Sequence, residues 1–214
     1  MSTRAEWQIA SAAILLLALA GGAAWFERER PAARVVATIA VLAALDVVGR
    51  IAFAALPNVK PTTDIAIVAG FALGASPGFM VGALTALVSN FYFAQGPWTP
   101  WQMAAWGACG LFGAILARVS RGRMGRLPMA ACCAAAGLAF GAVMNFGSAV
   151  NLGGAGVGTG FIAYSVQSLP FDVAHAAGNF AFYLLAGPVL LRMLMRSRDR
   201  AEVVWPQAAQ RAAS

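Results

Sequence analysis

Long apolar segments, separated by short loops rich in proline, glycine or arginine, follow one another along almost the whole chain. A helix needs about 20 apolar residues to cross the roughly 30 Å hydrocarbon core of a bilayer. The segments do not alternate apolar and polar positions, and an open sheet in lipid would leave backbone groups unpaired, so strands are not expected. The pattern predicts an all-α integral membrane protein with spans at 7–26, 34–56, 62–74, 77–93, 101–119, 129–149 and 169–194.

Two of these segments, 62–74 and 77–93, are short for membrane spans. A break rich in glycine and proline, residues 74–78 (GASPG), separates them. They form either two brief tilted helices or one re-entrant pair. Both arrangements return the chain to the side that it left, so the predicted topology is the same.

The composition strengthens the membrane assignment. Of the 214 residues, 60% are hydrophobic and only 11% are charged, whereas soluble chains carry about 25% charged residues. A globule of this size could not bury so much apolar surface, which excludes a soluble enzyme, a disordered chain and a disulfide scaffold. The three cysteines, Cys109, Cys132 and Cys133, show no C-x-x-C spacing, so we expect no metal site and no cofactor.

The arginines form three clusters between or after the apolar segments. With seven spans, all three clusters fall on one side of the membrane, and the opposite side carries only Arg4 and Lys60. Because cytoplasmic loops are enriched in Lys and Arg, we expect a plasma-membrane protein with its N-terminus outside and its C-terminus in the cytoplasm. The net charge of +7 then reflects topology rather than nucleic-acid binding. The clusters are Arg28, Arg30 and Arg34; Arg118, Arg121, Arg123 and Arg126; and Arg192, Arg196, Arg198 and Arg200.

The first segment, 7–26, has an alternative interpretation as a signal peptide. Small residues at 21–24 would supply the cleavage site. Cleavage would break the alternation of basic loops, so we expect this segment to be retained as an extra N-terminal transmembrane helix.

The loops expected on the outer side lie at 57–63, 94–100 and 151–160. They contain prolines, amides, hydroxyls and tryptophan, and almost no charge. Trp98 and Trp101, beside Gln102, would form an aromatic, amide-lined rim that suits a neutral or mildly polar organic ligand. Tryptophans are also expected in an interfacial aromatic belt, so this alternative stays open.

Polar residues also lie at the outer ends of several spans. Asp172, His175 and Asn179 share one helical face through spacings of three and four residues. Polar groups at membrane depth are costly and tend to face the protein interior or a cavity, although they also serve as hydrogen bonds between helices. As a set they predict an outward-opening pocket. The candidate substrate-binding residues are Asn58, Lys60, Asn90, Gln95, Trp98, Trp101, Gln102, His175 and Asn179.

Charged and small residues mark the helix predicted at 34–56. Asp46 and Arg50 lie four residues apart and can pair along the helix, which makes both charges less costly in the membrane. Ala40 and Ala44 lie on a stripe of small residues, which allows another helix to approach closely. Asp64, which follows two threonines, is expected to act at the N-terminus of the next helix as a carboxylate or cap.

Motifs that would allow the chain to work alone are absent from the sequence. There is no G-x-x-x-x-G-K-[ST] loop for ATP, no visible inverted repeat, and only one histidine. We therefore expect no catalytic residue and no enzyme activity in this chain. Two alternatives stay open: a small intramembrane enzyme that uses His175 and Asp172, and an accessory subunit without a small ligand.

Several motifs between Leu45 and Gly113 carry a family likeness. They lie at 57–62 (PNVKPT), 70–74, 82–90 (GALTALVSN) and 95–103 (QGPWTPWQM). This part of the chain resembles the substrate-binding S component of energy-coupling factor (ECF) vitamin transporters, and the hydropathy pattern extends the resemblance to the C-terminus. The resemblance implies a six-helix bundle that captures a vitamin at the outer face. It also implies two kinds of partner, a transmembrane T component and two cytoplasmic ATPases.

The resemblance further implies a domain organisation and a docking surface. Residues 1–30 would add one transmembrane helix and an inner loop, 31–200 would form the six-helix substrate-binding domain, and 201–214 would be a cytoplasmic tail. Ala40 and Ala44 match the A-x-x-x-A pattern with which the family's first core helix contacts the T component. A corrinoid of the cobalamin type is the first candidate ligand, with riboflavin, thiamine or a queuosine precursor as alternatives.

Overall fold

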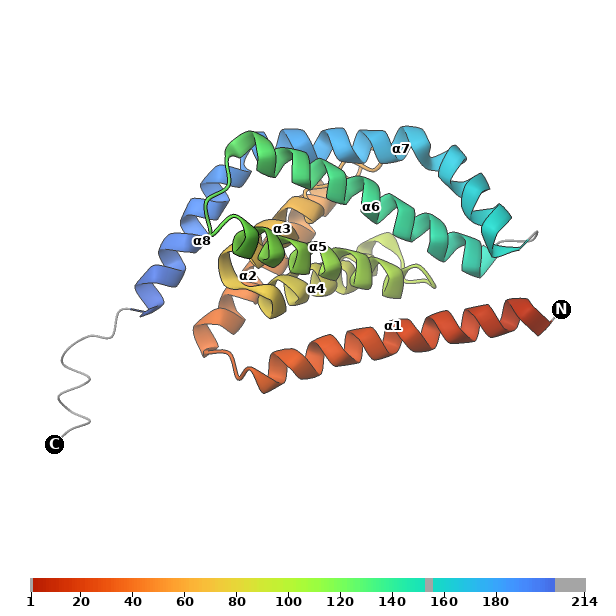
Figure 1. Ribbon diagram of the computed structural model, residues 1–214, viewed down its shortest axis with the longest axis horizontal. Helices are drawn as coiled ribbons and strands as arrows, with labels where there is room; N and C mark the ends of the chain where they lie inside the picture. Colours follow the sequence, from red (N-terminus) through yellow and green to blue (C-terminus); the bar gives the residue numbers. More distant parts are fainter. Residues whose placement is uncertain (1, 153–155, 203–214) are drawn as a thin grey trace.

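Helices account for all regular structure in the described part of the chain (Figure 1). The computed structural model describes residues 2–152 and 156–202, so most of the predicted tail at 201–214 lies outside the described residues. Long apolar runs favour helices in lipid because a helix satisfies its own backbone groups without water. The predicted all-α class is confirmed. The helices are α1 (Ser2–Arg28), α2 (Ala33–Ala52), α3 (Thr62–Leu73), α4 (Ala75–Phe93), α5 (Thr99–Val119), α6 (Arg126–Leu152), α7 (Val157–Leu185) and α8 (Gly187–Glu202).

Several of these helices are long and apolar enough to cross a membrane. They are α2, α5 and α6 among the described residues, and the pair α7–α8 makes a fourth if the two count as one bent span. Helix α3 is apolar but has only 12 residues. The structure thus supports a membrane protein, whereas the seven spans and the six-helix S-component bundle stay predictions.

The loop expected at 151–160 is shorter than the sequence predicts. Helix α6 continues to Leu152, and α7 already begins at Val157. Gly156, with φ +100°, stands directly before α7, in a backbone conformation that glycine adopts without strain. Glycines and hydroxyl groups lower the hydropathy in the first turns of α7 but do not prevent a helix. The apolar pattern therefore did not predict these turns as helical.

The last predicted span, 169–194, is divided between two helices. Helix α7 ends at Leu185, and α8 leaves it after Ala186 at an angle of 58°. Pro170 lies inside α7 instead of at its start. Proline removes one backbone hydrogen bond in a helix, a loss that membrane helices tolerate when their neighbours compensate for it.

The short helix α3 lies at the centre of the fold. Every residue from Thr62 to Ala72 is buried, and α3 contacts α2 and each of the helices from α4 to α8. It is separated from α4 by Gly74, with φ +103°, so the segments at 62–74 and 77–93 form two helices. Close packing depends on glycine, because a Cβ on Gly70 would overlap the carbonyl oxygen of Gly110 in α5. Small residues at such crossings let helix backbones approach one another.

Gly110→Ala is expected to lower the free energy of unfolding by about 1–3 kcal/mol, because the added methyl group would overlap the carbonyl group of Gly78. Gly21→Ala is the matched control. A Cβ at Gly21 meets no atom within 4 Å, and alanine is the better helix former by up to about 1 kcal/mol. Thermal unfolding of the detergent-purified variants measures both changes. Equal melting temperatures for the two variants would contradict the close crossing of α4 and α5.

The remaining helices surround this core. Helices α6 and α7 pack as an antiparallel hairpin along one side of the view, and α1 lies along the other side (Figure 1). Helix α1 contacts α4, α5 and α6, with Leu15 in one apolar cluster with Trp101 and Val150. This placement leaves exposed the face of α2 that carries Ala40 and Ala44.

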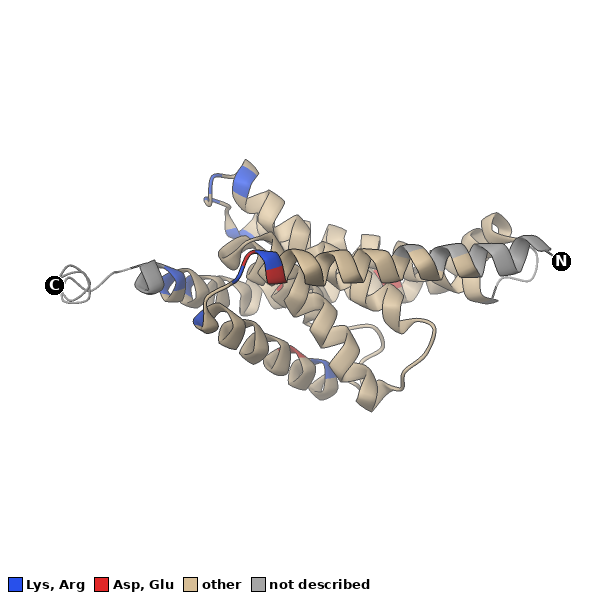
Figure 2. Cartoon of the chain, turned by 90° about the horizontal axis from the view of Figure 1, so that it is seen from below, with Lys and Arg blue, Asp and Glu red and all other residues tan. Residues whose placement is uncertain are grey.

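Basic residues gather at one end of the molecule (Figure 2). The connection between α1 and α2, the connection between α5 and α6, and α8 all bring Lys or Arg to the left end of that view. This grouping agrees with the predicted alternation of basic and uncharged loops. The C-terminal ends of α2 and α4 and the N-terminal end of α5 lie away from these basic segments. The polar candidates of the connections after α2 and α4 are found there, namely Asn58, Lys60, Asn90, Gln95 and Gln102.

Candidate functional site

A buried arginine organises the first of two polar networks. Arg50, near the C-terminus of α2, donates through Nη1 to Ser89 Oγ and to Asn90 Oδ1 of α4, the latter at 2.8 Å. Its guanidinium lies over the rings of Phe93 and Trp106, at 4.6 and 4.8 Å from their centroids. Hydrogen bonds and aromatic faces thus surround a charge that would otherwise be costly in an apolar interior.

Asn90 extends this network from α4 into the start of α5. Its Nδ2 donates to Thr99 Oγ1 at 2.9 Å and to Gln102 Oε1 at 2.7 Å. The Thr99 hydroxyl donates to Gln95 Oε1 at 2.9 Å, and Gln95 Nε2 donates to the Leu87 carbonyl at 2.9 Å. Three predicted site residues, Asn90, Gln95 and Gln102, are therefore brought together. We call the set Arg50, Ser89, Asn90, Gln95, Thr99 and Gln102 the arginine network.

The second network joins α3, α5, α7 and the loop before α3. The Trp106 N–H donates to Thr63 Oγ1 at 3.3 Å, and the same oxygen lies 3.1 Å from His175 Nε2. His175 Nδ1 lies 2.6 Å from the carbonyl oxygen of Asn58. Because a carbonyl only accepts, Nδ1 carries the ring proton, and the Thr63 hydroxyl then donates to Nε2. We call Asn58, Thr63, Trp106 and His175 the histidine network.

Trp106 connects the two networks, although the sequence analysis did not select it. Its ring faces Arg50 and stacks on Phe140 of α6, with centroids 4.5 Å apart and planes at 19°. The ring of Phe140 in turn lies 5.4 Å from that of His175. A signal was present in the sequence, because Trp106 follows Gln102 by four residues and shares its helical face.

The loop at 57–61 is fastened to the bundle. Asn58 Nδ2 donates to the Phe171 carbonyl of α7 at 3.0 Å. Lys60 Nζ donates to the carbonyls of Phe53 and Leu56, the latter at 2.8 Å, and so satisfies the C-terminal end of α2. Partial burial and the charge of Arg50 lower the pKa of Lys60. Asn58 and Lys60 therefore hold the loop in place. Asn58 also contacts His175, another of the candidate substrate-binding residues.

Two buried acidic residues lie beside these networks, and the sequence predicts their roles only in part. In the described part of the chain no ion pair joins Asp46 to Arg50, which is directed at α4 instead. The Asp46 carboxylate is fully buried, with the hydroxyls of Thr62 and Thr85 as its polar neighbours. Asp64 lies in the first turn of α3, so the predicted carboxylate at the N-terminus of this helix is confirmed. It does not cap the helix, because its oxygens have no hydrogen bond among the described residues.

The polar face of α7 packs against α6, as the spacing predicts. Asp172 Oδ2 accepts from Ser168 Oγ at 2.6 Å and from Asn145 Nδ2 at 3.3 Å. Asn179 is completely buried, and its amide has no hydrogen-bond partner in the described residues. The hydrogen bonds of Asp172 go to Ser168 and Asn145, so they do not supply the contact with His175 that an intramembrane enzyme would use.

The two predicted tryptophans lie apart from both networks. Trp98 and Trp101 line a cavity of about 70 Å³ between α5 and α6, together with Ser148 and Asn151. This volume is small beside the roughly 300–1,000 Å³ of pockets for organic ligands. Eight of the nine predicted residues thus belong to two networks, a loop anchor and a small rim cavity, and Asn179 is buried apart from them.

No protein-family model, no curated protein and no solved structure matches this chain. Among the described residues, no group of three or more His, Cys, Asp or Glu side chains is placed to hold a metal ion.

Proposed function

We propose that this chain is the membrane-embedded substrate-capture subunit of an ATP-driven ECF importer, and that it binds a vitamin or related micronutrient at its outer face. The main observation in support of this proposal is that two buried polar networks lie at the end of the bundle opposite the arginine-rich segments. Polar groups at membrane depth are costly and mark binding sites or pathways. In this proposal the N-terminus lies outside, the C-terminus lies in the cytoplasm, and the networks face the outer solution.

The chemistry of the networks supports a ligand that has both amide groups and aromatic or ring surfaces. Asn90, Gln95 and Gln102 offer donors and acceptors, and Trp106 offers an aromatic face. The unpartnered amide of Asn179 is a further group that a ligand could satisfy. A corrinoid of the cobalamin type, which is large and rich in amides, is the first candidate, and riboflavin and thiamine are the next.

Entry of the ligand requires the loop at 57–61 to leave α7. Two hydrogen bonds hold Asn58 to α7: its side chain donates to the Phe171 carbonyl, and its own carbonyl accepts from His175. Their loss would uncover Thr63 and His175, whose hydrogen-bonding groups then become available to a ligand. The loop would close again over the bound molecule.

The outward face of α2 supports the second part of the proposal, which is docking to a transmembrane partner. Ala40 and Ala44 are exposed, and so are the larger Val41 and Val48 beside them. A groove of about 380 Å³ between α2 and α8, which includes Ala37, adjoins this face. Small residues on a lipid-facing helix allow a partner helix to approach, and α1 packs elsewhere.

A panel of corrinoids, riboflavin and thiamine is expected to contain one compound that raises the melting temperature of the detergent-purified chain. A ligand that binds only the folded state at 100 times its Kd adds about 2.7 kcal/mol of stability. Gln102→Ala is expected to reduce the shift, because Gln102 bonds Asn90 in the arginine network. The matched control is Gln167→Ala, on the exposed side of α7, which should leave the ligand-induced shift in melting temperature unchanged.

The melting temperature without ligand is measured for each variant, so that a loss of stability is separated from a loss of binding. A folded protein that shows no shift with any compound would contradict the capture function. The accessory-subunit and enzyme hypotheses would then be favoured.

A further inference from the structure

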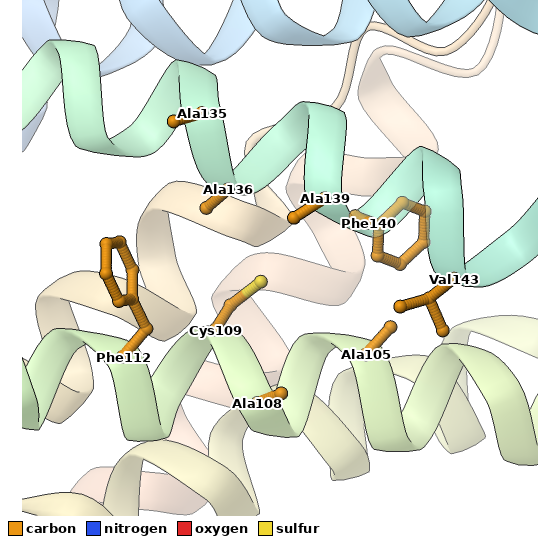
Figure 3. Close-up of a pocket in the computed structure, with 9 residues that line it drawn as sticks. All are labelled: Ala105, Ala108, Cys109, Phe112, Ala135, Ala136, Ala139, Phe140 and Val143. Carbon is orange, nitrogen blue, oxygen red and sulfur yellow. The ribbon is translucent and has the colours of Figure 1, made fainter.

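An apolar groove of about 410 Å³ runs between α5 and α6 (Figure 3). Helix α5 contributes Ala108, Cys109 and Phe112, and α6 contributes Ala136, Ala139 and Phe140, among others. The thiol of Cys109 supplies the only heteroatom among the lining side chains. Figure 3 shows why a gap remains: the facing alanines are too short to meet across the space between the two helices.

Water does not fill such a groove, because an ordered water needs two to four polar partners. Ala108 and Ala139 are exposed, so the groove opens at the surface of the bundle. Since α5 and α6 are both apolar enough to cross a membrane, the groove faces the hydrocarbon core of the bilayer. Its contents are therefore expected to be hydrocarbon.

A cluster of arginines stands at one end of the groove, where α5 is connected to α6. Arg118, Arg121 and Arg123 are exposed there. At a rise of about 1.5 Å per residue, Phe112 lies roughly 9 Å from Arg118 along α5 and Ala105 roughly 20 Å from it. One leaflet of the hydrocarbon core is about 15 Å deep. The groove thus occupies the depth that a lipid tail reaches when its headgroup lies at the arginines.

We propose that this side of the protein binds an anionic phospholipid, with its phosphate at Arg118, Arg121 and Arg123 and one acyl chain in the α5–α6 groove. Charge complementarity favours this occupant over a transmembrane helix of a partner, which would not need three arginines at the end of an apolar groove. Basic pockets beside transmembrane helices bind anionic headgroups in this way. The inference is independent of the proposed transport function.

Native mass spectrometry of the full chain in detergent tests the proposal, with palmitoyl-oleoyl phosphatidylglycerol and the phosphatidylcholine of the same chains as probes. Phosphatidylglycerol is expected to bind more tightly. Arg121→Gln together with Arg123→Gln should weaken its binding by more than about tenfold and leave phosphatidylcholine unchanged. The matched control replaces Arg192 and Arg196 of α8, which are also exposed, with glutamine and should keep the preference.

The acyl-chain part is tested by Ala139→Trp, which would fill the groove from an exposed position and is expected to weaken the binding of both lipids. Ala108→Leu is a smaller second variant, in case the tryptophan disturbs the fold, and melting temperatures verify folding. Equal affinities for the two lipids in the unmodified chain would overturn the headgroup site. Unchanged lipid binding in folded groove variants would overturn the acyl-chain site.

Discussion

Arg50→Leu is expected to lower the free energy of unfolding by about 3 kcal/mol or more. The substitution removes the donor to Ser89 and Asn90 and leaves the buried Asp46 without the positive charge beside it. A hydrogen bond to a charged group contributes about 1.5–3 kcal/mol, and the buried Ser89 and Asn90 each lose such a bond. Thermal or denaturant unfolding in one detergent measures the loss.

Two further variants separate the charge effect from a general effect of leucine. Asp46→Asn combined with Arg50→Leu is expected to recover part of the lost stability, because no uncompensated carboxylate remains at position 46. Arg192→Leu replaces an exposed arginine of α8 and should change stability by no more than about 0.5 kcal/mol. If Arg50→Leu unfolds at the same temperature as Arg192→Leu, Arg50 does not hold α2 to α4.

In the proposed importer, Ala40→Trp is expected to abolish uptake while it spares ligand binding. Ala40 lies on the exposed face of α2, outside both polar networks, so the tryptophan does not reach the arginine or histidine network. It would hold a partner helix several ångströms away, at a surface where small residues allow close approach. Uptake is measured in cells that supply the T component and the ATPases, and binding is measured on the purified chain by thermal shift.

The control for this experiment is Val173→Trp, at a position of α7 that is also exposed. It adds the same bulk to another lipid-facing surface and should keep both uptake and binding. Loss of binding in Ala40→Trp would place the stripe in the bundle core, and normal uptake would remove the docking role. Normal uptake leaves the capture function intact, so the two parts of the proposal can fail separately.

The two networks connect the loop at 57–61 with the rest of the bundle. Asn58 contacts His175, which contacts Thr63, and Trp106 connects Thr63 with the ring contact of Arg50. The loop at 57–61 is therefore connected to α5 through hydrogen bonds and to α2 through the ring contact of Trp106 with Arg50. In the proposed importer, α2 also carries the docking face, so ligand closure and partner docking share one helix.

Part of the candidate site could be predicted from the sequence. Asn90, Gln95 and Gln102 lie within 13 positions, on both sides of one tight connection, so a short loop necessarily brings them close. His175 and Asn179 could be selected from their spacing on one helical face. The contact between His175 and Asn58 could not be predicted from the sequence, because 117 positions separate the two residues.

The hydropathy of the sequence determined those features of this protein that depend on neighbouring residues in the chain. It determined the all-helical class, most helix positions and the grouping of basic segments, because each depends on the composition of a short window. It failed in the first turns of α7 and at Ala186, where polar residues and a bend do not follow the apolar pattern.

Only the tertiary structure decided which side chains meet. Arg50 bonds to α4 rather than to Asp46, and Trp106 joins both networks. These contacts depend on the rotation of each helix about its axis and on how closely the helices cross. Crossing distances are set by backbone contacts such as that of Gly70 with Gly110, which involve residues far apart in the chain and leave no periodic signal in it.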